Sequence, residues 1–144
     1  MYGRKTYEMM ESYWPTAGSQ PNASKHDIEH SKWYKDVHKV VLSRSMKDQK
    51  RENTTIISDS ISEKVKAVKQ SAGSEILVFG SPSATHALME QDLIDGYWLF
   101  LNPIILGKGI PLFKGIQQNV KLNLLGTHQF NCGVTELSYD VKRS

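Results

Sequence analysis

Three short segments carry cations, hydroxyls or glycine where a predicted helix begins or a predicted strand ends. Gly3-Arg4-Lys5-Thr6 opens a predicted helix with two cations and a hydroxyl. Ser43-Arg44-Ser45 follows a predicted strand, and its guanidinium and hydroxyls can grip a phosphate monoester by charge-assisted hydrogen bonds. Gly80-Ser81 joins another predicted strand to a helix, whose free N–H groups and positive dipole end suit a pyrophosphate. Each segment therefore suits an anionic ligand.

Each segment alone also has a simpler explanation. Gly80 can allow a tight turn while Ser81 or Ser83 caps the helix. Cations near helix starts are common, and polar residues after a strand can be ordinary loop residues. The turn at Gly80 is neither a P-loop nor the three-glycine Rossmann fingerprint. An α/β sheet would bring all three segments to one rim, where such folds bind ligands, and this favours a ligand site over the simpler explanations. Together the three segments predict a phosphorylated dinucleotide.

Other residue patterns give weaker support for catalysis. Five histidines are spread along the chain: His26, His30, His38, His86 and His128. Only His26 and His30 have metal-ligand spacing, and they lie in a polar segment without an obvious third ligand, so no metal is predicted. No serine lies in a Gly-x-Ser-x-Gly elbow, which disfavours a hydrolase. Four large aromatic residues can either wall an aromatic substrate or fill the core and rim: Trp14, Trp33, Tyr34 and Trp98.

The composition bounds the class of protein. The chain has 144 residues, 39% of them hydrophobic and 23% charged, which suits one globular domain with its own core. A net charge of +3 with interspersed signs does not predict a nucleic-acid-binding face. The single cysteine, Cys132, excludes an intrachain disulfide and favours a reducing compartment. The longest apolar run, Tyr97–Leu106, is interrupted by Asn102 and Pro103, so we expect no membrane span and a cytoplasmic protein.

Three segments predict helices, over residues 4–13, 60–73 and 82–92. Pro15 is expected to stop the first helix, and the polar residues 16–31 after it predict a surface loop. The second helix begins with the capping-box pattern Ser60-Ile61-Ser62-Glu63 and ends at Gly73. The third begins with Pro82, which a first helical turn accepts.

Six apolar or alternating segments predict strands: Lys39–Ser43, Asn53–Ile57, Glu75–Gly80, Gly96–Leu106, Leu122–Phe130 and Val134–Val141. The near-continuous apolar run of Glu75–Gly80 is typical of a strand buried on both faces. The last two strands flank Asn131-Cys132-Gly133 and predict an antiparallel hairpin. The order of elements predicts an α/β domain around a mixed sheet.

The residues resemble a known family in the order in which they occur. Gly-Arg-Lys-Thr-Tyr-Glu at residues 3–8 resembles the start of the cofactor helix of dihydrofolate reductases. Val41–Ser45 resembles the strand that meets the adenosine phosphate, and Leu77–Ser81 resembles the strand and turn that hold the pyrophosphate. Leu93–Asp95 and Pro103–Phe113 are similar to the signature of the branch that forms the reductase domain of riboflavin-biosynthesis deaminase/reductases, including small stand-alone bacterial members.

The resemblance implies a single dihydrofolate-reductase-like domain over residues 1–144, with three layers, a mixed and mostly parallel central sheet, helices on both faces and a C-terminal antiparallel hairpin. It implies NADPH as cofactor, and Arg44 favours NADP over NAD because a 2'-phosphate needs a cation. The cofactor-binding residues implied are Arg4, Lys5, Thr6, Ser43, Arg44, Ser45, Phe79, Gly80, Ser81, Ser83, Ala84 and Thr85, and Met10 and Phe79 would face the substrate pocket.

Two departures from the family pattern bear on function. Two glycines usually follow the strand where this chain has Gly80-Ser81-Pro82, so the backbone approach to phosphate is expected to differ. The family normally has a further strand, a glycine-containing loop and a helix before the segment that starts here at residue 3, so we expect the domain to be N-terminally incomplete. The sheet would then be truncated, completed by a partner in a homodimer, or closed differently.

The expected function is an NADPH-dependent oxidoreductase that transfers hydride to a small heterocyclic substrate. The resemblance implies a dihydrofolate-like substrate or one like 5-amino-6-(5-phosphoribosylamino)uracil. The protein would contribute orientation and electrostatics, and no residue is assigned as catalytic. The alternative is a non-catalytic NADP-binding or dimer-assembly module that lacks a complete active site.

Overall fold

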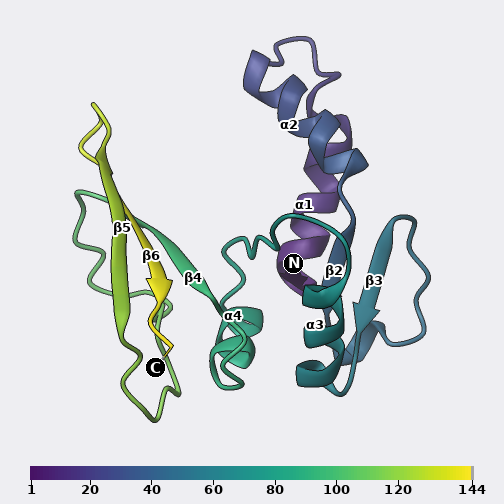
Figure 1. Ribbon diagram of the computed structural model, residues 1–144. Helices are drawn as coiled ribbons and strands as arrows, with labels where there is room; N and C mark the ends of the chain where they lie inside the picture. The colour runs from purple at the N-terminus through teal and green to yellow at the C-terminus, as the bar shows by residue number, and fades with distance from the viewer. Residues whose placement is uncertain (144) are drawn as a thin grey trace. The chain divides into compact units, whose positions relative to one another are not determined.

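The computed structural model describes residues 1–143 and divides them into two units, Met1–Thr85 and the residues from His86 onward (Figure 1). The described residues contain four α-helices and six strands. The α/β class and the C-terminal hairpin predicted from the sequence are confirmed, and the strands are distributed over two three-stranded sheets. No helix among residues 1–143 is both long and apolar enough to cross a membrane.

The first unit contains a parallel sheet of order β1-β2-β3. Its strands are β1 (Tyr2–Gly3), β2 (Lys39–Leu42) and β3 (Thr54–Ile57), and the last two confirm predicted strands. Val41 in β2 lies opposite Tyr2 in β1 and Ile56 in β3. Because β2 is paired on both edges, all four of its residues are buried, as its β-branched apolar sequence requires.

The helix α1 (Arg4–Ala17) is longer than the sequence predicted. Pro15 was expected to stop it, but the helix continues for two residues beyond this proline. Proline lacks the N–H that would bond to the carbonyl four residues earlier, yet its fixed φ is helical. Near the end of a helix this loss affects one hydrogen bond only, so the final turn survives.

The helix α2 (Lys25–Asp36) occupies much of the segment that was predicted to be a surface loop, so that prediction was wrong. The Asp27 N–H donates to Ser24 Oγ at 3.1 Å, and the Ser24 N–H donates to Asp27 Oδ2 at 2.9 Å. This reciprocal capping box fixes the helix start despite the polar composition of the segment. The Ser-x-x-Asp spacing was visible in the sequence and is the signal that was overlooked.

The helix α3 (Ile61–Gln70) confirms the predicted helix, but its predicted capping box is wrong. Ser60 has a left-handed backbone, with φ of 48°, and its side chain makes no capping hydrogen bond. An N-cap residue needs an extended backbone to aim its hydroxyl at the first turn. The ion pair between Lys64 and Asp59 lies at this helix start instead.

The predicted strand Glu75–Gly80 is wrong, because residues 75–79 have no regular secondary structure and belong to neither sheet. The nitrogen of Met1 donates to the Leu77 carbonyl, which holds this segment beside β1. Since β1 has only two residues, it offers little backbone for a ladder. Ile76 and Leu77 are more than a third exposed, whereas Phe79 stacks on Tyr2 with ring centroids 6.1 Å apart.

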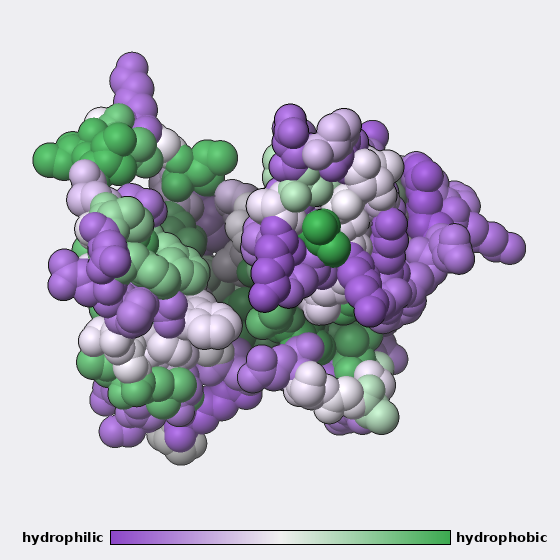
Figure 2. All heavy atoms as spheres, turned by 90° about the horizontal axis from the view of Figure 1, so that it is seen from above, coloured by the Kyte–Doolittle hydropathy of each residue, from purple (hydrophilic) through white to green (hydrophobic). Residues whose placement is uncertain are grey.

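The second unit contains an antiparallel sheet of order β4-β6-β5, formed by β4 (Gly96–Leu101), β5 (Leu122–Gln129) and β6 (Thr135–Val141). Strand β4 is shorter than predicted because Asn102 and Pro103 follow it, and proline supplies no N–H to a ladder. Exposed apolar side chains of this unit appear as green surface at the left of Figure 2, and Trp98, Leu101 and Leu125 are each more than 60% exposed.

The helix α4 (Pro82–Met89) runs across the boundary of the two units, and its end lies in the second. The Leu93 N–H donates to the Leu88 carbonyl at 3.0 Å and the Asp92 N–H to the Met89 carbonyl at 3.1 Å. With the positive φ of Asp92, these bonds form a Schellman motif. The motif explains why the helical pattern of the sequence reaches Asp92, three residues beyond the regular helix.

Candidate functional site

The first unit brings the start of α1 against the start of α4. The buried Gly3 N–H donates to Ser81 Oγ at 2.8 Å, and Thr6 Oγ1 donates to the same oxygen at 3.2 Å. Ser81 is only 2% exposed, and its carbonyl accepts from the Thr85 N–H at 2.9 Å. Two segments that are 78 residues apart in sequence are thus joined through one serine side chain.

Both helix starts offer the chemistry of an anion site. The N-cap of α1 is Gly3, which has no side chain to cap the first turn, and no acidic residue lies in that turn. Arg4 and Lys5 follow it and are exposed. At α4, Gly80 has a φ of +39°, which glycine adopts without strain. Uncapped N–H groups and two positive dipole ends therefore meet in one region.

The strand end of β2 joins this region through Arg4. Arg4 Nη1 donates to Ser45 Oγ at 3.1 Å, and the Ser43 and Ser45 hydroxyls are 3.2 Å apart. Arg4 Nε also pairs with Glu8 at 2.7 Å, which orients the guanidinium along α1. Arg44 lies between the two serines, in a 3₁₀ turn over Arg44–Met46, and is exposed. All three anion-suited segments of the sequence are therefore neighbours.

The remaining predicted site residues also belong to the first unit, and they lie near Gly3 or pack against the core. Ser83 is exposed and its Oγ lies near Gly3, while Ala84 is buried and Thr85 is partly buried. Met10 and Phe79 are partly buried and pack against one core cluster: Tyr2, Tyr7, Tyr34, Val41 and Met46. The two predicted substrate-pocket residues thus contact the same cluster.

The sequence left open whether Trp33 of α2 walls a substrate or fills the core and rim, and it did not include His30 in the site. Trp33 meets the ring of Phe79 edge-on, with centroids 5.9 Å apart. His30 lies 5.0 Å from Trp33 and 3.9 Å from Trp14, measured between ring centroids. These contacts depend on α2 being a helix, because residues three apart then share one face.

His30 makes the stability of this region sensitive to pH. Its Nε2 is buried and has no hydrogen-bond partner among the described residues. Burial, and secondarily the positive charge of nearby His26, lower the pKa of His30. A histidine with a lowered folded-state pKa favours the neutral form, so its contribution to stability is full above the unfolded pKa and is lost as pH falls below it.

We expect the melting temperature to decline as pH falls below about 6.5, the pKa of a histidine in an unfolded chain. His30→Phe keeps a ring in place and removes the titration, so this part of the decline should disappear. The measurement is the melting temperature of each protein from about pH 7.5 to about pH 5.5. An unchanged slope in His30→Phe would contradict the assignment.

Gly3 is confined by the neighbouring segment. A Cβ at this position would lie 2.7 Å from Ser81 Oγ and 3.3 Å from Ser83 Oγ. In Gly3→Ala, the Ser81 hydroxyl must rotate away, which leaves the Gly3 N–H buried and unpaired. We expect a loss of about 1–3 kcal/mol in the free energy of unfolding, measured by urea denaturation.

Two further variants test this explanation. Gly73→Ala is the matched control, because a Cβ there meets nothing within 4 Å. Ser81→Ala removes the acceptor of the same hydrogen bond, so combining it with Gly3→Ala should cost clearly less than the sum of the single losses. Additive losses would mean that the Gly3–Ser81 hydrogen bond does not link the two positions energetically.

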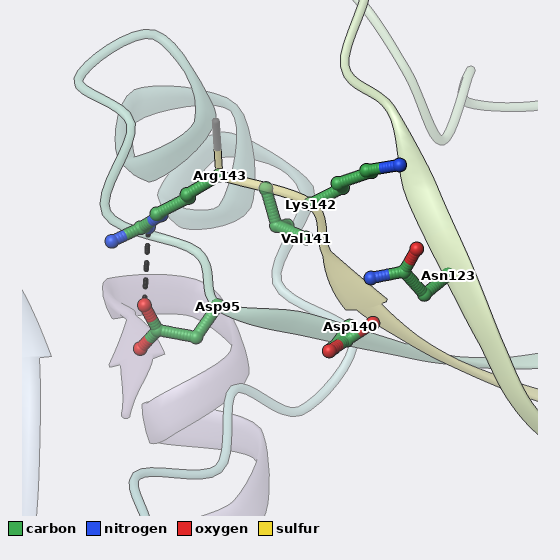
Figure 3. A pocket seen from close by; sticks show the side chains of 6 residues that line it. All are labelled: Asp95, Asn123, Asp140, Val141, Lys142 and Arg143. Carbon is green, nitrogen blue, oxygen red and sulfur yellow. Dashed lines mark ion pairs between the residues drawn. The ribbon is translucent and has the colours of Figure 1, made fainter.

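A pocket in the second unit is lined mainly by polar and charged residues (Figure 3). It lies at the ends of β5 and β6 and is lined by Asp95, Asn123, Asp140, Val141, Lys142 and Arg143. Arg143 Nη2 pairs with Asp95 at 3.1 Å and donates to the carbonyls of Asp92 and Ile94 at 3.2 Å each. These bonds fasten the chain after β6 to the turn before β4, a structural role.

Comparison with known proteins adds the family context. The family model of the RibD C-terminal domain matches residues 1–135. The uncharacterized protein YyaP of Bacillus subtilis (strain 168) is 30% identical over 141 residues, which cover 96% of this chain and 71% of YyaP. The uncharacterized protein YwjB of the same organism is 33% identical over 101 residues, which cover 70% of this chain and 58% of YwjB.

A solved structure shares the fold. The crystal structure of a candidate riboflavin biosynthesis protein from Shewanella sp. PV-4 matches with a TM-score of 0.72 at 20% identity. The match covers 99% of this chain and 72% of that chain. This likeness confirms the fold class that the resemblance of the sequence implied.

Proposed function

The chain belongs to the RibD C-terminal domain family, and from that premise we propose that it binds NADPH and reduces a small heterocyclic substrate by hydride transfer. One observation carries the proposal: the starts of α1 and α4 meet at the buried hydrogen bond between Gly3 and Ser81. Arg4 extends from this point to Ser45 and so connects the helix starts to the end of β2. Such an arrangement suits a ligand with phosphates at two separate places.

The residues present fit NADPH in charge and in hydrogen-bonding capacity. The first-turn N–H groups of α1, with the exposed Arg4 and Lys5 side chains beside them, would hold the pyrophosphate. The Arg44 guanidinium would pair with the 2'-phosphate, with the neighbouring Ser43 and Ser45 hydroxyls as further donors. The lack of an acidic residue in the first turn of α1 removes a charge that would oppose phosphate binding.

The chain's own residues would orient the reactants and exclude water. NADPH, when bound, supplies the hydride, so the protein needs no nucleophile. Met10 and Phe79 pack against the core cluster and stay partly exposed, which provides an apolar wall for a substrate ring. Removing water from such a wall strengthens the electrostatic interactions between cofactor and substrate.

We propose that the substrate is dihydrofolate-like or resembles 5-amino-6-(5-phosphoribosylamino)uracil, since both carry a planar nitrogen heterocycle. The alternative is a module that binds NADP without turnover. NADPH oxidation with a pterin or pyrimidine substrate, followed by absorbance, separates the two. Saturable NADPH binding without oxidation of any such substrate would favour the alternative.

The direct test is a titration of the protein with NADPH and, separately, with NADH. Cofactor fluorescence and the melting temperature are followed together, because a ligand that binds only the folded state raises its stability. We expect saturable binding that favours NADPH. Absence of binding to either dinucleotide would contradict the proposal.

A further inference from the structure

Four aromatic rings form a continuous row in the first unit, which we call the aromatic row: Trp14, His30, Trp33 and Phe79. The centroids of successive rings are 3.9, 5.0 and 5.9 Å apart. The row begins on α1, passes through α2 and ends on the segment before Gly80. Three separate parts of the chain therefore contribute rings to one surface.

Both ends of the aromatic row are anchored on the core cluster, and Trp33 between them is accessible. Trp14 and Phe79 pack against the core cluster that contains Tyr2 and Tyr7. Trp33 remains 37% exposed although it contacts two other rings. Exposing part of an indole forgoes some of the free energy that its burial would provide. Ligand sites are lined mainly by hydrophobic and aromatic side chains, so an accessible indole beside anchored rings can contact a ligand.

The row ends beside the proposed cofactor site. Phe79 directly precedes Gly80 and Ser81, whose hydroxyl accepts the hydrogen bond from Gly3. Met10 and Trp14 are four residues apart on α1 and so share one face of the helix. A planar ring placed against Trp33 would thus lie close to Phe79, one of the two residues assigned to the substrate side.

We propose that Trp33 is a specificity-determining residue, whose indole stacks on the planar ring of a heteroaromatic substrate next to Phe79. The inference rests on the proposed reductase function. Trp33 and Phe79 are inclined at 70°, so a ring stacked on the indole meets Phe79 edge-on. Both stacked and edge-on arrangements of aromatic rings are favourable. His30 packs against Trp33, and Trp14 in turn packs against His30.

The test separates stacking from packing with two substitutions at one position. Trp33→Leu keeps an apolar side chain that can pack on Phe79 but has no ring face, whereas Trp33→Phe keeps a ring. The probe is 6-methylpterin, whose binding is measured by calorimetry with and without saturating NADPH. Ile28→Ala is the matched control, since Ile28 is an exposed apolar residue on the same helix.

We expect Trp33→Leu to weaken binding of the pterin by about fivefold to a hundredfold, the range for loss of one stacking contact with a nucleobase. Trp33→Phe and Ile28→Ala should stay within about threefold of the wild type. NADPH affinity should be the same in all four proteins, which also shows that the variants are folded. In turnover with the pterin, Trp33→Leu should raise KM more than it lowers kcat.

Three results would overturn the inference: no pterin binding by the wild type, equal pterin affinity in the leucine and phenylalanine variants, or a parallel loss of NADPH affinity. Its failure is distinguishable from failure of the proposed function. NADPH binding with a pterin affinity independent of Trp33 overturns this inference alone. Pterin binding that depends on Trp33, in a protein that binds no NADPH, overturns the reductase function alone.

Discussion

Replacing Arg44 by alanine is expected to weaken NADPH binding by about tenfold to a hundredfold and to leave NADH binding nearly unchanged. A hydrogen bond to a charged group contributes about 1.5–3 kcal/mol, which corresponds to that range of affinity. NADH lacks the 2'-phosphate, so the substitution removes no contact between the protein and NADH. The ratio of the two affinities, measured by fluorescence titration, is therefore the quantity that reports on this residue.

The surroundings of Arg44 explain why a large effect is expected from an exposed side chain. Ser43 and Ser45 flank it in the sequence, their hydroxyls lie 3.2 Å apart, and Arg4 donates to Ser45 at 3.1 Å. A phosphate here would meet two guanidinium groups and two hydroxyls. Because the site is exposed, salt will screen part of the attraction, and the NADPH preference should be greater at low ionic strength.

Lys66→Ala provides the control for a general loss of positive charge, since Lys66 is exposed on α3. It should leave both affinities unchanged. Arg44→Lys should recover part of the NADPH affinity, because it keeps the charge but not the planar fork of donors. Equal losses for NADPH and NADH in Arg44→Ala would show that Arg44 does not contact the 2'-phosphate.

Replacing Tyr34 by alanine is expected to destabilise the first unit by about 3–5 kcal/mol, the range for truncating a large buried ring. Tyr34 is 0% exposed and belongs to the core cluster. Its hydroxyl donates to Glu11 Oε2 at 3.0 Å, and the Lys39 ammonium lies 4.7 Å from its ring centroid. Burial, together with the Glu11 carboxylate, raises the pKa of Tyr34, so the phenol stays protonated and keeps donating.

Urea denaturation of Tyr34→Ala and Tyr34→Phe tests this prediction. The phenylalanine variant keeps the ring and loses only the hydrogen bond to Glu11, so its loss should be about 0.5–1.5 kcal/mol. Because the chain has two units, the transition should be followed by a signal from the first unit, such as the fluorescence of Trp14 and Trp33 in proteins that also carry Trp98→Phe, since Trp98 belongs to the second unit. Similar losses in both variants would mean that the ring contributes little to the packing.

The predictions for Arg44 and Tyr34 concern different properties of the first unit, cofactor affinity and stability. Tyr34 ties α2 to α1 through Glu11, and α2 carries His30 and Trp33 of the aromatic row. Loss of the ring at position 34 should therefore disturb the substrate side of the site. Loss of the Arg44 side chain should disturb the cofactor side alone. Binding of NADPH and of a pterin to each variant would reveal this division.

Much of the fold was predictable because local sequence patterns agree with the final structure. The β-branched run at Lys39–Leu42 forms β2, and the alternation after Gly133 forms β6 in an antiparallel hairpin. The helix α3 follows its apolar spacing even though Ser60 does not cap it. The wrong capping prediction arose because a side-chain motif requires a backbone conformation that residue types alone do not determine.

One error had a tertiary cause and one had a local cause. Residues 75–79 have the composition of a buried strand, but β1 provides too short a partner for a ladder in the described part of the chain. Strand formation depends on a neighbour that is distant in sequence, whereas helix formation depends on residues nearby. The helix α2, in contrast, was missed despite its local capping box, because its polar composition resembles that of a loop.

The sequence by itself determined which residues suit phosphate, since cations, hydroxyls and glycine at the ends of elements are recognisable from residue type and order. Only the tertiary structure decided that these segments meet, through the Gly3–Ser81 and Arg4–Ser45 hydrogen bonds. It also decided that α2 brings Trp33 to Phe79. The physical reason is that each contact joins residues far apart in the chain, and the sheet and the packed core, rather than local preference, fix their distance.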